Sequence, residues 1–237
     1  MTDDRHGASF QVRRKQSRRR RLRQGLLVGL VVVVVAALVW LVGFSSVLGV
    51  NRVQVDGTTL VTADQVTAAA QVVNGTPLAR VDGKAIAARV TAAIPEVASV
   101  TVSRHWPNTL VIYVTERAIV YQVQSGDGYQ WVDATGRLFH SSPDAQPVPV
   151  ATVDSTNQPL VADVATVVTA LPGDLLPHVV NIDAATPDSI TLNLDDGRQV
   201  IWGSADQSDL KAQVIGPLLQ QSGKVYNVSA PAYPSVH

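Results

Sequence analysis

The sequence predicts an α+β protein in which a single N-terminal membrane helix is followed by two domains. Three observations lead to this prediction. One stretch has only apolar or small side chains, the next region changes from helical to strand periodicity, and the remainder combines short strands with two amphipathic helices. The chain contains no cysteine, so its domains must be held together by their cores rather than by disulfides.

The apolar stretch runs from Gly25 to Phe44 and carries no charge. A helix of this length would be about 30 Å long, which is enough to cross the hydrocarbon core of a bilayer. Helices in soluble cores are seldom apolar on every face over such a length. We therefore expect a membrane helix over residues 25–47, whose anchoring side chains include Leu26, Val33, Trp40 and Phe44, with the two aromatic residues in the interfacial belt.

Charge is distributed unevenly about this stretch. Nine basic and two acidic residues precede it, whereas ten basic and seventeen acidic residues follow it. Because Arg and Lys are retained on the cytoplasmic side, we expect residues 1–24 to be a cytoplasmic basic tail and the rest to be extracytoplasmic. Such a run beside a membrane helix sets topology and contacts lipid headgroups, so no specific nucleic-acid binding is expected. A cleaved signal peptide is the alternative, but its apolar core is shorter and ends in a small-x-small site, and no Ala-x-Ala follows here.

The first domain is expected over residues 50–117 with the order strand, helix, helix, strand, strand. Val53 and Val55 alternate with polar residues as in a strand. Two helices follow, one capped by Thr62 and Gln65 and one capped by Asp82. Their inner stripes are Val66, Ala69, Ala70 and Val73 in the first helix, and Ile86, Val90, Ala93 and Ile94 in the second.

From Val97 the period changes to two. Residues 98–102 and 110–114 alternate on either side of a turn at Trp106-Pro107-Asn108, which predicts an antiparallel hairpin. This order of elements describes a three-stranded sheet with helices on one face.

The second domain is expected over residues 118–230, followed by a tail over 231–237. It begins with a hairpin whose Asp-x-x-Gly turn starts at Asp133, and an extended connection follows over residues 141–149. A helix with an apolar stripe is predicted over Leu160–Leu171, then a meander of three strands. A last helix is predicted with a Ser204/Gln207 capping box and the inner stripe Leu210, Val214 and Leu218.

The final strand is the candidate binding site. It comprises Val225, Tyr226, Asn227, Val228 and Ser229, and only a tail containing prolines follows it. We expect this strand to lie at a sheet edge, where a partner strand can pair with its free N–H and C=O groups and Tyr226 can serve as an aromatic anchor. The alternative is an ordinary strand that the tail covers.

These motifs resemble the FtsQ/DivIB family of bacterial cell-division proteins. The strongest are Gly75-Thr76-Pro77-Leu78, the run from Val100 to Pro107 that contains Arg104 and Trp106, and Glu116-Arg117. The family usually continues Glu-Arg-x-Pro, whereas this chain has Ile119 in the place of the proline. The family's last strand typically has an aspartate where this chain has Asn227.

The resemblance implies a POTRA domain followed by a β domain, acting as a scaffold of the divisome without a cofactor. It further implies binding of FtsB-like and FtsL-like membrane partners, and through them localisation and control of the septal peptidoglycan synthase. Arg104 and Trp106 have two interpretations. They form a recruitment surface, or Arg104 pairs with Glu116 or Asp56 while Trp106-Pro107 stiffens the hairpin; we prefer the second.

Signatures of catalysis are absent from the sequence. It contains no His-Glu-x-x-His, Gly-x-Ser-x-Gly, Ser-x-x-Lys, Walker or Rossmann pattern, and its five histidines are scattered singly. We therefore expect no catalytic, cofactor-binding or metal-binding residues. The two remaining alternatives are a POTRA-containing component of secretion or envelope assembly and an enzyme of the cell envelope.

Overall fold

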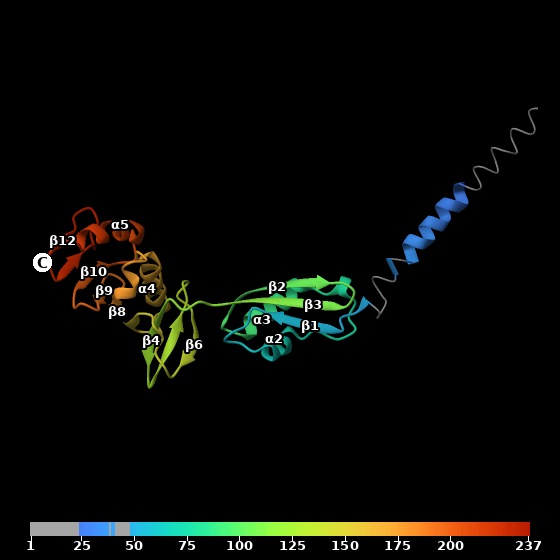
Figure 1. Ribbon diagram of the computed structural model, residues 1–237, viewed down its shortest axis with the longest axis horizontal. Helices are drawn as coiled ribbons and strands as arrows, with labels where there is room; N and C mark the ends of the chain where they lie inside the picture. The colour runs from blue at the N-terminus through green and yellow to red at the C-terminus, as the bar shows by residue number, and fades with distance from the viewer. Residues whose placement is uncertain (1–23, 38, 41–47) are drawn as a thin grey trace, which may run out of the picture. The chain divides into compact units, whose positions relative to one another are not determined.

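The computed structural model describes residues 24–37, 39–40 and 48–237 (Figure 1). Residues 24–37 and 39–40 are helical. The rest of the chain folds as two compact units. The first holds the described residues up to Asp56 together with Ala63–Val90 and Val100–Tyr113, and the second holds Gly57–Thr62, Thr91–Ser99 and Val114–His237.

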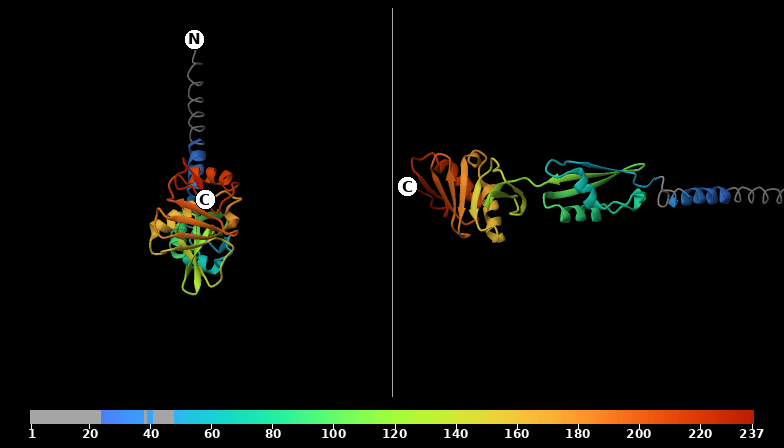
Figure 2. Two further views of the ribbon diagram at one scale, coloured as in Figure 1. Left: turned by 90° about the vertical axis from the view of Figure 1, so that its left-hand side faces the viewer. Right: turned by 90° about the horizontal axis from the view of Figure 1, so that it is seen from below.

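The POTRA-like order of elements predicted from the sequence is present. It consists of β1 (Arg52–Asp56), α2 (Ala63–Ala70), a short 3-10 helix (Leu78–Arg80), α3 (Gly83–Ala93), β2 (Val97–His105) and β3 (Thr109–Glu116). The sheet order is β1-β3-β2, and β1 lies parallel to β3 with Arg52 opposite Thr109. Figure 2 shows α2 and α3 along one side of this sheet, as expected.

Local sequence explains the start of α3 but not the end of α2. The Asp82 carboxylate accepts hydrogen bonds from the amides of Lys84 and Ala85 at 3.0 and 3.1 Å, which confirms the predicted cap. The α2 helix ends at Ala70, and Gln71 has a positive φ of 50°. Val73 therefore leaves the predicted inner stripe and is 72% exposed.

The second unit is built on a mixed sheet of nine strands. Their order is β12-β11-β10-β9-β8-β7-β4-β5-β6. The bounds are β4 Tyr121–Ser125, β5 Gly128–Val132, β6 Leu138–Ser142, β7 Val150–Val153, β8 Val179–Ala184, β9 Ile190–Leu194, β10 Gln199–Gly203, β11 Val225–Asn227 and β12 Ser235–Val236. The pairs β4/β7, β7/β8 and β10/β11 are parallel, and the meander β8–β9–β10 is antiparallel as predicted.

Two helices pack against this sheet, and their buried side chains share one hydrophobic core with those of the strands. The first, α4 (Gln158–Ala170), buries the predicted stripe of Leu160, Val164, Val167, Val168 and Leu171. The second, α5 (Ser208–Leu218), links β10 to β11 and contains Pro217 in its last turn.

The predicted inner face of α5 is correct at Leu218 and partly so at Val214, which packs against the core, but it is wrong at Leu210. Leu210 is exposed, and the buried residues are Ser208, Lys211, Ile215 and Leu218. Lys211 is buried because its ammonium donates to the Ser204 carbonyl oxygen at 2.7 Å. The capping box does not form either, because Gln207 has a positive φ of 55° and makes no side-chain cap bond.

Candidate partner-binding edge

The last strand, β11, does not lie at the edge of the sheet. On one side it runs parallel to β10, and on the other it pairs antiparallel with β12, where Tyr226 lies opposite Val236 and Asn227 opposite Ser235. The prediction of an open edge at residues 225–229 is therefore wrong. The tail contains a strand too short to be recognised from alternation, and this strand covers β11.

Backbone bonds show which groups of β11 face the tail. The Val225 amide donates to the His237 carbonyl oxygen at 2.9 Å, and the His237 amide donates to the Val225 carbonyl oxygen at 2.9 Å. The Val228 amide instead donates to the Ile201 carbonyl oxygen of β10 at 3.0 Å. A partner that replaced the tail would thus pair with Val225 and not with Val228.

The side chains of the last strand divide between the core and the surface. Tyr226 is 1% exposed, and its hydroxyl donates to the Gln221 and Gly223 carbonyl oxygens at 2.7 and 3.0 Å. Val228 is also fully buried. Tyr226 is therefore a core residue rather than an anchor exposed to a partner, whereas Val225 and Asn227 are partly exposed and Ser229 is exposed.

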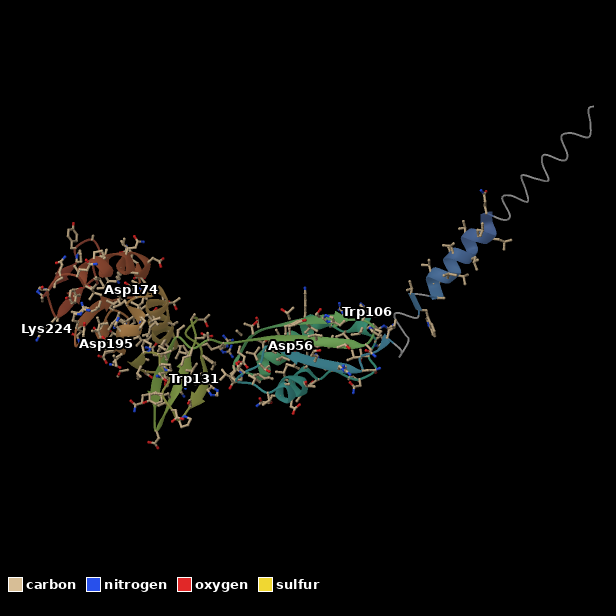
Figure 3. The ribbon with its side chains drawn as sticks, viewed as in Figure 1. Asp56, Trp106, Trp131, Asp174, Asp195 and Lys224 are labelled. Atoms are coloured by element: carbon tan, nitrogen blue, oxygen red, sulfur yellow. The ribbon has the colours of Figure 1, made fainter. Side chains whose placement is uncertain are left out.

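Arg104 and Trp106 lie at and beside the β2–β3 turn. Arg104 donates to the Val81 carbonyl oxygen at 2.7 Å, so the predicted pairing with Glu116 or Asp56 is wrong. Trp106 is 52% exposed. Figure 3 shows Trp106 at the end of the first unit at which the chain enters from residue 48.

The Glu116-Arg117 pair organises a junction inside the second unit. Glu116 accepts bonds from the Thr59, Leu60 and Val61 amides at 2.8 to 3.0 Å and from the Thr59 hydroxyl. Arg117 donates from Nε to the Pro95 carbonyl oxygen at 2.9 Å and forms an ion pair with Asp133.

The Asp133 carboxylate closes the predicted Asp-x-x-Gly turn. It accepts bonds from the Thr135 amide and hydroxyl and from the Arg137 amide. Gly136 completes this turn with a φ of 78°, and a Cβ there would lie 2.4 Å from the Ala162 Cα. The motif residues are thus structural, a role that sequence spacing alone did not reveal.

Acid is expected to weaken this junction through Glu116. Partial burial raises the pKa of its carboxyl, but hydrogen bonds from the Thr59 hydroxyl and from the Leu60, Val61 and Thr59 amides outweigh burial and lower the pKa from 4.5 to about 2. A depressed native pKa contributes stability that is present above pH 4.5 and is lost as the pH falls toward 2.

We therefore expect Glu116→Gln to lower the free energy of unfolding by about 1–2 kcal/mol at neutral pH, because the Thr59, Leu60 and Val61 amides lose an ionised acceptor at a partly exposed site. The gap between the variant and the natural chain should narrow as the pH falls through this range, as measured by urea unfolding. Asp127→Asn, at an exposed turn, is the control and should change the free energy of unfolding by less than about 0.5 kcal/mol. A difference in the free energy of unfolding that stays the same at every pH would contradict the lowered pKa of Glu116.

The described histidines with acidic neighbours lie apart from one another. No group of three or more His, Cys, Asp or Glu side chains is placed to hold a metal ion among the described residues. His140 lies 3.1 Å from Glu96 and His178 lies 2.9 Å from Asp195, both as simple pairs. A groove of about 620 Å³ in the second unit has a mostly apolar lining, drawn from residues 119–120, 122, 145–150, 168–169, 171, 176–177 and 179–180.

Two protein-family models match consecutive parts of the chain. Residues 48–117 match the family model of the POTRA domain, FtsQ-type, and residues 121–230 match that of the cell division protein FtsQ/DivIB, C-terminal.

Cell division protein FtsQ of Streptomyces venezuelae is 35% identical over 97% of this chain and 91% of its own length. The FtsQ proteins of Mycobacteroides abscessus and Mycolicibacterium smegmatis are 35% and 38% identical over 89% and 87% of this chain, which spans 68% and 62% of their lengths.

A solved structure of the major extracytoplasmic domain of DivIB from Geobacillus stearothermophilus aligns with 42% of this chain and 87% of its own, at 18% identity and a TM-score of 0.35. That score is too low to support an argument about the fold. The family models and the three FtsQ relatives decide the assignment: the chain belongs to the FtsQ/DivIB family of cell-division proteins.

Proposed function

We propose that this chain is a non-enzymatic scaffold of the divisome that binds the extracytoplasmic segments of FtsB-like and FtsL-like partners. Through them it would localise and regulate the septal peptidoglycan synthase. Its domains would be a POTRA domain over residues 50–117 and a β domain over 118–230, both extracytoplasmic. Membership of the family supports this proposal.

The observation that carries the partner proposal is the weak cover on β11. Its outer edge is held by two paired residues of β12 and by His237, at the very end of the described chain. A longer partner strand would satisfy the same amide and carbonyl groups of Val225 and continue past Asn227. We therefore assign partner capture to replacement of the tail on β11.

The test uses the full chain in nanodiscs and an FtsB-type extracytoplasmic segment from the same organism. Val225→Pro removes a donor that faces the tail side, where proline is tolerated, and should abolish capture. Deleting residues 232–237 removes the competing strand and should tighten binding several-fold. Binding is measured by biolayer interferometry.

Two controls accompany these variants. Tyr233→Ala changes an exposed side chain of the tail and should leave the affinity unchanged. Thermal unfolding shows whether each variant retains its fold. Capture that survives Val225→Pro, or that is lost on deletion of the tail, would rule out replacement of the tail.

We also propose that residues 25–47 anchor the chain in the cell membrane by a single pass, with a cytoplasmic N-terminus and a location at the septum. Among the described residues, no helix is long and apolar enough to cross a membrane. The described helix supports the proposal because Leu26, Val33 and Trp40 are each more than half exposed, as lipid-facing side chains would be. Phe44 and the tail over 1–23 lie outside the described residues.

A further inference from the structure

Two loops of the first unit are bonded to the residues that follow the apolar stretch. The Val50 amide donates to the Thr76 carbonyl oxygen, and the Gly75 amide donates to the Val50 carbonyl oxygen, both at 2.9 Å. The Asn51 amide donates to the Asn108 carbonyl oxygen at 2.9 Å. We call this region, made of Gly49–Arg52, Gln71–Pro77 and Trp106–Asn108, the Val50 end.

The Val50 end carries exposed apolar side chains that the core does not use. Among the described residues of the first unit from residue 48 onward, the exposed large hydrophobic side chains are Val73, Trp106 and Tyr113, at 72%, 52% and 43%. The two most exposed both lie at the Val50 end. Burying apolar surface is worth about 25 cal/mol per Å², so this end would gain by contact with an apolar phase.

Exposed basic residues outnumber acids near the Val50 end, where the nearby acid is Asp82, which adjoins the Val81 that Arg104 contacts. Arg52 and Arg104, both exposed, lie at or beside the Val50 end, where β1 begins and β2 finishes. Asp56 lies where β1 finishes, away from the Val50 end (Figure 3), and Asp64 lies in the first turn of α2. Each basic residue held near an anionic lipid surface contributes about 1 kcal/mol of attraction.

The covalent chain limits how far the Val50 end can stand from a bilayer. Val50 follows Phe44 by six residues, and a fully extended chain of that length spans at most about 20 Å. This step rests on the membrane anchor proposed above. Given that anchor, the end with the exposed Trp and the arginines is the end that the chain holds at the membrane.

We propose that the Val50 end docks on the anionic bilayer that holds the anchor, with Val73 and Trp106 at the boundary between headgroups and acyl chains. Trp is suited to this position because its ring is apolar and its N–H reaches water. Arg52 faces the phosphate groups, and Arg104 reaches them with the guanidinium donors that the Val81 carbonyl oxygen does not engage. The docking fixes how the POTRA domain stands on the membrane surface, independently of any partner.

The absence of cysteine allows a direct test by single spin labels. Labels are placed by Val33→Cys, Val73→Cys, His105→Cys and Tyr113→Cys in the full chain, in vesicles of phosphatidylglycerol and phosphatidylethanolamine. Collision with a water-soluble nickel chelate is measured by EPR. We expect labels at 73 and 105 to be several-fold less accessible than the matched label at 113, which is exposed on β3.

Two further changes separate docking from simple proximity. Trp106→Ser, at an exposed side chain, should return the labels at 73 and 105 to the accessibility of 113. Arg52→Glu should do so in anionic vesicles. The Arg52→Glu test applies even if Trp106→Ser impairs folding, which circular dichroism would detect.

The outcomes distinguish the docking from the anchor. Suppose that the label at 33 is shielded from the chelate while the labels at 73 and 105 are as accessible as the label at 113. That result would overturn the docking and leave the anchor in place. A label at 33 that is open to the chelate would overturn both. Shielding at 73 and 105 that appears only after a protein partner is added would make this a recruitment surface and overturn lipid docking.

Discussion

Replacing Arg117 by alanine is expected to lower the free energy of unfolding of the second unit by about 3 kcal/mol, near the lower end of the cost of breaking a buried ion pair. The Arg117 and Asp133 side chains are only 12% and 8% exposed. Their separation leaves a carboxylate buried without its cation, although the bonds from Thr135 and Arg137 remain. Urea unfolding of the full chain, followed by the tryptophan fluorescence to which the buried Trp131 and Trp202 contribute, measures the change.

A surface pair provides the matched control. His178 and Asp195 are 58% and 49% exposed, so His178→Ala should cost less than about 1 kcal/mol. The double variant Arg117→Ala/Asp133→Asn should lose less than the sum of the single changes, because no unpaired charge is then buried. Additive losses would show that the two side chains do not stabilise each other.

Replacing Trp202 by alanine is expected to cost about 3–5 kcal/mol, the largest loss from a single core substitution in this unit. Trp202 is fully buried in β10, and its Nε1 donates to the Ser208 hydroxyl at 3.0 Å. Alanine leaves a cavity between β10 and the first turn of α5. Because β11 pairs with β10, partner capture should fall together with stability.

Trp202→Phe separates the two contributions. It keeps most of the packing and loses the hydrogen bond to Ser208, so a loss of about 1–3 kcal/mol is expected. Thermal unfolding and binding of the FtsB-type segment are measured on the same samples. If the Trp202→Ala variant unfolded at the same temperature as the natural chain, the described packing of Trp202 would be contradicted.

The parts of the fold that the sequence predicts correctly are those with repeated local signals. The stripe of α4 has five apolar positions at helical spacing, and the Asp82 cap precedes α3 directly, so each needs no distant partner. Trp131 to Phe139 likewise forms its hairpin around a turn encoded by Asp133 and Gly136.

The predictions of helix faces fail where backbone conformation or contacts outside the apolar pattern determine which side chains are buried. Lys211 lies outside the predicted stripe of Leu210, Val214 and Leu218, yet it is buried and its ammonium donates to the Ser204 carbonyl oxygen. Val73 fits a helical stripe, but the left-handed backbone at Gln71 ends α2 first.

The candidate site shows the same division. The segment containing the last strand was predicted correctly, and its pairing was not, since Ser235–Val236 is too short to show alternation. The structural roles of Glu116 and Arg117 depend on Thr59 and Asp133, which are distant along the chain.

The parallel pairing of β11 with β10 has a consequence for the export of the chain. Because β10 and β11 are parallel, they cannot be joined by a tight turn. The connection that contains α5 must pack on one face of the sheet before β11 can pair with β10. With the N-terminus held in the cytoplasm, as proposed above, α5 and β11 would leave the translocation machinery after β10. The edge that we propose for partner capture would then be completed only after α5 and β11 have both been delivered.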